Sequence, residues 1–250
     1  MGRYLITLSY DGTAYHGWQI QPTGISVQEE LQRALSMALR VETSVTGAGR
    51  TDTGVHAHMM TAHFDTDLDV DCSHLAYKLN RMLPQDIAVS SIKGVDGSFH
   101  ARFSATSRTY IYYIHTHKNP FIRAYSWELH YDLDFAAMNM AAATLLVHND
   151  FAAFQKSKTD NKTTLCKVSE ARWIEDGDGN GKWHFIITAD RFLRNMVRAI
   201  VGTLIDVGRH KICVRDFINI IESGDRRAAG ESAPANGLFL ERIVYDTKEQ

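Results

Sequence analysis

A glycine-rich segment, Gly47–Ala57, brings an arginine, a histidine and a single carboxylate, Asp52, close together in the chain. Such a loop can expose the carboxylate as a nucleophile or a general base, with Arg50 beside it for a phosphate or for the carboxylate itself. A simple glycine-rich turn, in which Asp52 bonds its own backbone, explains the same residue types. A phosphate-cradling loop is a further alternative, but no Walker-type Gly-Lys-Ser/Thr is present and no helix is expected to follow.

Three arginines, Arg191, Arg194 and Arg198, surround the start of a predicted helix. Their spacing predicts that Arg194 and Arg198 share one helix face. The planar guanidinium fork suits a carboxylate or a phosphate, so one arginine is a candidate partner for a carboxylate and the others for phosphates. An exposed basic stripe is the alternative.

The segment Phe99–Tyr110 alternates aromatic side chains with arginines. In nucleic-acid-binding proteins, basic residues follow the backbone while rings stack on bases. Core packing explains Phe99 and Phe103 equally well. Tyr110 and Tyr112 share one face of a predicted strand, and we expect at least one tyrosine of this strand to point into a cleft.

Two histidine pairs have the spacing of a metal site on a strand, where alternate residues share a face. They are His56 with His58 and His115 with His117. No cysteine pair or HExxH pattern supports them, so we do not expect a metal site.

The composition is that of an ordinary globular protein: 250 residues, 44% hydrophobic and 22% charged. Lys+Arg 27 against Asp+Glu 29 gives a net charge of −2, which excludes a globally basic nucleic-acid binder but not a local basic patch. The mostly apolar stretch Phe135–Val147 is too short to span a bilayer. No signal peptide is expected, and the three cysteines form no CxxC pair, so we expect a cytoplasmic protein.

The order β-α-β-β-α-β is predicted twice, which is the ferredoxin-like arrangement. In the first half, strands are expected at Tyr4–Ser9, in a short segment that ends near Thr46, at Met59–Phe64 and at Ile87–Val95. Helices are expected from the Ser26–Glu29 capping box to Leu39 and from Ser73 to Leu83. The second has expected strands at Thr106–Thr116, Leu165–Ile174, Trp183–Ala189 and Leu238–Tyr245, and expected helices at Asp134–Val147, Phe192–Val207 and Val214–Ser223. We therefore predict an α+β protein with two ferredoxin-like subdomains, 1–104 and 105–250. Their mainly antiparallel sheets are expected to meet at a central active-site cleft.

Several separate motifs resemble, in the same order, those of the tRNA pseudouridine synthase A family. They are Tyr10–Gln21 with Ser26–Glu29, Gly49–Ala57, Phe99–Phe103 with Arg108–Tyr110, Phe192–Arg198 and Ala233–Leu240. The Gly49–Ala57 loop is the most specific match, and it departs from the family mainly in Thr53, where alanine is common.

The resemblance implies an isomerase that converts uridine to pseudouridine at positions 38, 39 and/or 40 of the tRNA anticodon stem-loop, without a cofactor. It implies that Asp52 is the catalytic aspartate, Tyr110 the base-stacking tyrosine and Arg198 the arginine that pairs with the aspartate. Arg50 matches a position that helps to extrude the target base. The family further implies a homodimer, with one tRNA lying across both subunits.

Other side chains are predicted to contact the RNA. The candidates are His100, Arg102, Lys118, Lys156 and Lys158. Together with Arg50, Arg123, Arg226 and Arg227, the basic ones among them could form a basic surface on one side of a dimer. The alternatives are a non-catalytic RNA-binding protein of the same fold and, more distantly, a metal-dependent hydrolase built on the histidines.

Overall fold

The computed structural model describes residues 1–156, 163–177 and 179–246, which divide into two compact units. Unit 1 comprises Met1–Arg108 together with residues 239–246, and unit 2 comprises Thr109–Leu238. The C-terminal strand therefore lies in unit 1, whereas the sequence placed it in a second subdomain of residues 105–250. A functional division at residue 104 stays a prediction.

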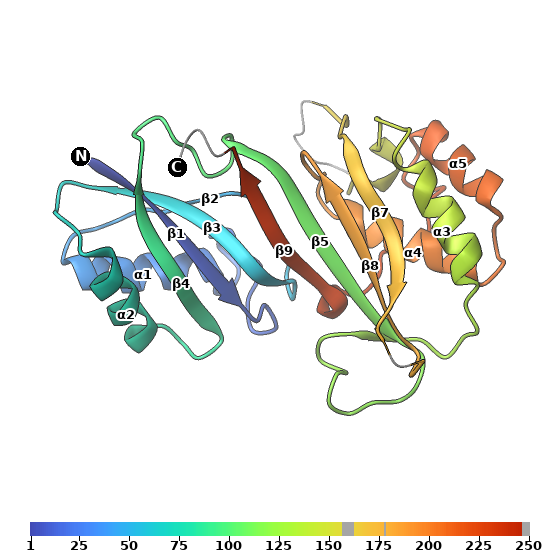
Figure 1. The fold of residues 1–250 in the computed structure, drawn as a ribbon, viewed down its shortest axis with the longest axis horizontal. Helices are drawn as coiled ribbons and strands as arrows, with labels where there is room; N and C mark the ends of the chain where they lie inside the picture. The colour runs from blue at the N-terminus through green and yellow to red at the C-terminus, as the bar shows by residue number, and fades with distance from the viewer. Residues whose placement is uncertain (157–162, 178, 247–250) are drawn as a thin grey trace. The chain divides into compact units, whose positions relative to one another are not determined.

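The sheet of unit 1 has the strand order β4-β1-β3-β9 (Figure 1). The central strand β1 (Gly2–Tyr10) is antiparallel to both β3 (His56–Thr66) and β4 (Ile87–Val95). The short β2 (Thr46–Gly47) pairs with β3. The last strand, β9 (Leu238–Tyr245), runs parallel to β3, with His56 opposite Phe239. This pairing explains why the end of the chain belongs to unit 1.

Two helices complete unit 1, and both begin at side-chain caps. Helix α1 (Val27–Leu39) starts after Ser26, whose Oγ accepts a hydrogen bond from the backbone N–H of Glu29, as predicted. Helix α2 (Cys72–Met82) starts after Asp71, so the predicted cap at Ser73 is wrong by two residues. The Asp71 carboxylate accepts from the His74 N–H at 2.9 Å. Asp and Ser cap about equally well, so residue type alone does not choose between them.

The sheet of unit 2 has the order β5-β8-β7 (Figure 1). Its strands are β5 (Ala105–His115, from Thr109 onward in this unit), β8 (Lys182–Ala189) and β7 (Val168–Glu175). Strands β7 and β8 are antiparallel, and the short β6 (Trp127–Glu128) runs parallel to β5. The fold of the chain is thus α+β with mainly antiparallel pairing. Strand β7 begins later than predicted, because Leu165 forms an isolated bridge with Asp150 instead.

Helix α3 (Phe135–Thr144) packs on β7 and on helices α4 (Met196–Gly208) and α5 (Val214–Ser223). Its predicted cap is confirmed, since Asp134 Oδ1 accepts from the Ala137 N–H at 2.9 Å. It ends at Thr144 rather than at Val147, and a turn follows. Two short 3-10 helices, η1 (Ala152–Phe154) and η2 (Ala235–Gly237), lie in the connections. No helix in the described ranges is long and apolar enough to cross a membrane.

The start of α4 differs from the prediction of a helix from Phe192. Asn195, with φ of 66°, adopts the left-handed conformation, and the helix begins only at Met196. A left-handed residue interrupts the helical path, so Arg194 and Arg198 do not share a helix face as predicted. The predicted apolar face is confirmed from Met196 onward, where Ile200 and Leu204 are completely buried.

Candidate active site

Asp52 lies half-buried on the loop between β2 and β3. Its carbonyl oxygen accepts a hydrogen bond from the Val55 N–H at 3.1 Å, which closes a tight turn. On the preceding side, the Thr51 Oγ1 lies 2.9 Å from the buried Tyr10 hydroxyl, and the Thr51 carbonyl accepts from the Trp18 N–H at 3.3 Å. The backbone of Asp52 is therefore held from two sides, which fixes the direction in which its carboxylate leaves the loop.

Two glycines of the Tyr10–Gln21 motif lie directly against this loop. A Cβ on Gly17, whose φ is +83°, would overlap the Thr51 carbonyl oxygen and lie 3.1 Å from the Asp52 carbonyl carbon. A Cβ on Gly12 would overlap the Val55 carbonyl oxygen. Only glycine allows this approach of one backbone to the other. The sequence identified the motif by resemblance alone, and its contact with the Asp52 loop was not predicted.

The side chains next to Asp52 in the sequence are exposed. Arg50 and Thr53 both lie on the surface of the loop. Arg108, by contrast, reaches back to the loop from β5, and its guanidinium donates to the Ala48 carbonyl at 3.5 Å and to the Ala105 carbonyl at 2.9 Å. Arg50 is thus accessible from solvent, whereas Arg108 connects the loop to the neighbouring strand.

The histidines that could have formed metal pairs have other partners. The His56 Nδ1 accepts from the Gly12 N–H at 3.0 Å, and His58 is paired with Glu241 at 2.6 Å. The His115 Nδ1 lies 2.9 Å from a serine hydroxyl. Within the described parts of the chain, no group of three or more His, Cys, Asp or Glu is arranged to hold a metal ion.

In unit 2, Tyr110 and Tyr112 lie on the same strand but in different surroundings. Tyr112 is fully buried, and its hydroxyl donates to the Pro234 carbonyl at 2.9 Å. Tyr110 is only half-buried, and its ring meets the Phe192 ring edge-on, with centroids 5.1 Å apart. Tyr112 is therefore a core residue, and Tyr110 is the tyrosine of this pair that a ligand can reach.

Arg198 lies in the first turn of α4 and is half-buried. Its Nε donates to the Ala233 carbonyl at 2.7 Å, and its own carbonyl accepts from the Ala233 N–H at 2.9 Å. A Cβ on Gly202 would overlap the Glu231 carbonyl oxygen, so the segment 231–233 lies directly on α4. The Ala233–Leu240 motif thus orients the Arg198 guanidinium and, through Pro234, the buried Tyr112.

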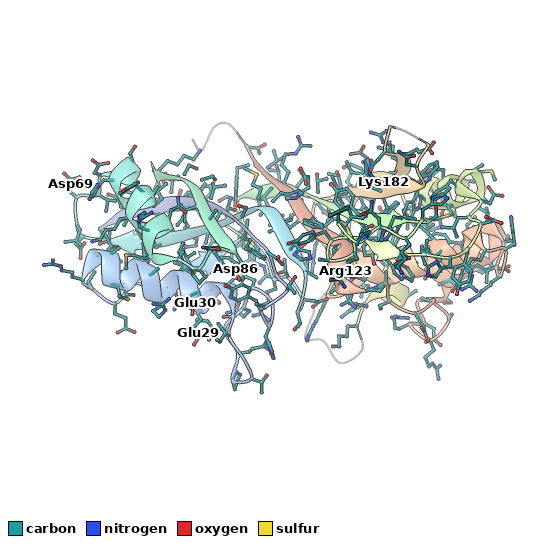
Figure 2. All side chains as sticks on the ribbon, turned by 90° about the horizontal axis from the view of Figure 1, so that it is seen from below. Glu29, Glu30, Asp69, Asp86, Arg123 and Lys182 are labelled. Carbon is teal, nitrogen blue, oxygen red and sulfur yellow. The ribbon has the colours of Figure 1, made fainter. Side chains whose placement is uncertain are left out.

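The lysines predicted to contact RNA lie in unit 2. Lys118 is exposed and lines a pocket of about 390 Å³ together with His117, Asn180 and Lys182. Figure 2 labels Lys182 in this unit, at the start of β8. Lys156 is also exposed, and its N–H donates to the Arg194 carbonyl at 3.0 Å. Lys158 lies outside the described residues.

Two arginines expected on the basic surface make contacts within unit 2. Arg226 donates to the carbonyls of Ala229 and Gly230 at 3.3 and 3.1 Å. Arg227 is paired with Asp225 at 2.8 Å. The contacts of these two arginines therefore lie within the connection after α5, and their contact with RNA stays a prediction.

Comparison with known proteins defines the class. Residues 6–104 and 141–246 match the family model of the tRNA pseudouridine synthases, and the chain belongs to this family. Curated relatives named tRNA pseudouridine synthase A include that of Bacteroides fragilis, 56% identical over 97% of this chain and 96% of the relative. That of Bacteroides thetaiotaomicron is 54% identical over 98% and 91%, and that of Bacillus subtilis 40% identical over 98% and 99%. The chain is an isomerase that forms pseudouridine in tRNA, as the motifs predicted.

A solved structure described as a putative chlorite dismutase aligns with a TM-score of 0.22 and 11% identity, covering 88% of this chain and all of the other. A score this low carries no argument about the fold.

Proposed function

We propose that the chain isomerises uridine at positions 38, 39 and/or 40 of the tRNA anticodon stem-loop, with Asp52 as the catalytic carboxylate. The observation that carries this proposal is the backbone contact of Gly12 and Gly17 with the Asp52 loop. A loop held this tightly fixes the backbone from which the Asp52 side chain leaves before the substrate binds, and a preorganised backbone favours catalysis.

The chemistry needs a carboxylate and no redox partner. The C1′–N1 bond of uridine breaks, the base turns and C1′ bonds to C5. The C5 proton then leaves to a base, and N1 takes up a proton, so that the product is an isomer of uridine. Asp52 can assist by adding to the sugar, by adding to the base, or by removing the C2′ proton. Each of these routes uses the same carboxylate, and each is compatible with a loop that presents Asp52 half-exposed.

Arg198 is proposed as the partner of the Asp52 carboxylate. The Ala233 carbonyl holds the guanidinium by its Nε at 2.7 Å, which sets the plane of the fork. A carboxylate removed from water in a closed site is costly unless a cation accompanies it. Arg198 would therefore stabilise Asp52 once the RNA excludes solvent.

Tyr110 is proposed to stack on the target uracil, and Arg50 to help extrude it from the stem. Taking a base out of a stem costs a few kcal/mol, and stacking on an aromatic ring recovers about 1–3 kcal/mol. The edge contact with Phe192 holds the Tyr110 ring in one orientation. Exposed Arg50 is suited to a phosphate beside the extruded nucleotide.

The remaining expectations are proposals about assembly. We propose a homodimer that binds one tRNA across both subunits and acts in the cytoplasm, for which the three free thiols suit a reducing compartment. We also propose that the two halves are related ferredoxin-like subdomains meeting at the active-site cleft. The β4-β1-β3 strand order of unit 1 supports the ferredoxin-like arrangement of the first half.

The test uses tRNA transcripts carrying tritium at uridine C5, because isomerisation releases this label to water. Asp52→Asn keeps the side-chain shape and removes the charge, so we expect tRNA binding within a few-fold of the parent and no detectable tritium release. Asp69→Asn is the matched control, since Asp69 is an exposed carboxylate elsewhere in unit 1 (Figure 2). Substantial tritium release by Asp52→Asn would overturn the assignment of Asp52.

A further inference from the structure

The turn that joins β4 to β5 carries one phenylalanine in the core and one on the surface. Phe99 is 2% exposed, and its ring lies 4.9 Å from the Tyr245 ring. Phe103, four residues later, is 76% exposed. An exposed phenylalanine contributes little to the core, and its ring is accessible to a ligand.

The turn that presents Phe103 is closed by its own hydrogen bonds. The His100 carbonyl accepts from the Ser104 N–H at 2.9 Å, and the His100 N–H donates to the Ser104 Oγ at 3.1 Å. The His100 Nδ1 accepts from the N–H groups of Arg102 and Phe103, at 3.2 and 3.4 Å. The imidazole thus acts as an internal cap that fixes the backbone on which Phe103 stands.

Side chains from elsewhere in unit 1 hold the same turn in place. The Ala101 N–H donates to the His63 Nδ1 at 3.2 Å, and the Ala101 carbonyl accepts from the Tyr245 hydroxyl at 2.8 Å. The Arg108 guanidinium donates to the Arg102 carbonyl at 2.5 Å. A group held on a rigid turn loses little entropy when it binds, which favours affinity.

The surface of this turn combines an aromatic face with a cation. The His100 and Phe103 rings have centroids 4.3 Å apart, and the Arg102 guanidinium carbon lies 5.7 Å from the Phe103 centroid. His100 is uncharged in this arrangement, because its Nδ1 accepts two hydrogen bonds, and burial lowers its pKa. Arg102 is therefore the cation beside the exposed ring.

We propose that Phe103 stacks on an unpaired base of the bound tRNA while Arg102 contacts the adjoining phosphate. The inference rests on the proposed function, and it adds a base-binding residue to that function. Aromatic faces beside arginines bind single-stranded nucleic acid in this way, and the positive charge of Arg102 complements the phosphate backbone.

The test compares variants of Phe103 in tRNA binding, measured by filter retention at several salt concentrations. Phe103→Leu removes the π-face and keeps an apolar side chain, so we expect tRNA affinity to fall about 5- to 100-fold with an unchanged salt slope. Phe103→Trp should retain affinity, and its tryptophan fluorescence should be quenched by tRNA more strongly than that of the parent, which has four tryptophans of its own. Tyr77→Leu, at an exposed aromatic on α2 of the same unit, should bind like the parent.

Two results would overturn the inference. One is parent-like tRNA affinity in Phe103→Leu, with no more fluorescence quenching by tRNA in Phe103→Trp than in the parent. The other is a change in the oligomeric state of Phe103→Leu by sedimentation, which would assign the ring to a contact between copies of the chain. Both results are independent of the Asp52 assay. Tritium release by Asp52→Asn would overturn the catalytic assignment, but weaker tRNA binding by Phe103→Leu would still support the inference about Phe103.

Discussion

Gly17→Ala should disable catalysis from a position that is not itself expected to react. The new Cβ would stand at a φ of +83° and overlap the Thr51 carbonyl oxygen. A left-handed alanine costs about 1–2 kcal/mol, and forcing a contact into packed backbone costs about 1–3 kcal/mol more. The backbone before Asp52 has to move to relieve the overlap. A displacement on the order of 1 Å can cost about 10²-fold in rate.

The assay for Gly17→Ala is single-turnover tritium release at saturating enzyme, with thermal unfolding and tRNA binding measured alongside. We expect a fall in rate of about 10²-fold, tRNA affinity within a few-fold of the parent, and a loss in Tm on the order of 5–15 °C. Gly49→Ala is the matched control in the catalytic loop itself, because nothing lies within 4 Å of a Cβ there. A parent-like rate in Gly17→Ala, or an equal loss in Gly49→Ala, would refute the reasoning.

Three further predictions concern other residues. Tyr110→Phe should lower the single-turnover rate by about 10²–10⁴-fold with little change in tRNA affinity if the hydroxyl takes the C5 proton; a parent-like rate would limit Tyr110 to stacking. Arg50→Ala should weaken tRNA binding and reduce its salt slope by about one phosphate, and an unchanged affinity, salt slope and turnover would contradict this role. Burial and then the nearby Arg3 lower the pKa of His63 to about 4. The unfolded chain binds a proton near pH 6.5, so stability should fall by about 2–3 kcal/mol between pH 6.5 and 4, and His63→Gln should flatten this dependence in urea unfolding.

Much of the fold follows from local sequence signals. The Ser26 and Asp134 caps and the apolar face of α4 are found where the pattern placed them. The predicted starts of α2 and α4 were wrong, because the pattern of apolar residues does not determine where these helices begin. Asp71 and Ser73 are equivalent caps, and the left-handed Asn195 has no periodic signature.

The sequence also did not predict which strand the last strand pairs with. Residues 238–245 have the composition of a strand, as predicted, but composition does not say which sheet a strand joins. Counting elements assigned it to the second half, whereas it pairs in parallel with β3 at His56 and Ala57. Pairing across this distance along the chain depends on tertiary packing.

For the site, the sequence supplied the candidate residues but not the contacts that position them. Asp52 stood out as the one carboxylate in a glycine-rich loop. The roles of Gly17 and of the Ala233 carbonyl appear only when distant backbones come together. Phe99 and Phe103 are the same residue type in one short segment, so sequence alone could not tell which is buried.

Unit 1 is built from two segments of the chain that are synthesised at different times. Strand β9 leaves the ribosome only after residues 109–238 have been made, which at about 5–20 residues per second takes roughly 7–26 s. Throughout that interval, His56 and Ala57 lack their partner strand, and the His56 ring lacks the Phe239 ring that stacks on it at 4.5 Å. The nascent chain therefore carries two residues of β3 without their partner strand, four and five positions after Asp52, and such an edge can pair with another chain until β9 is made.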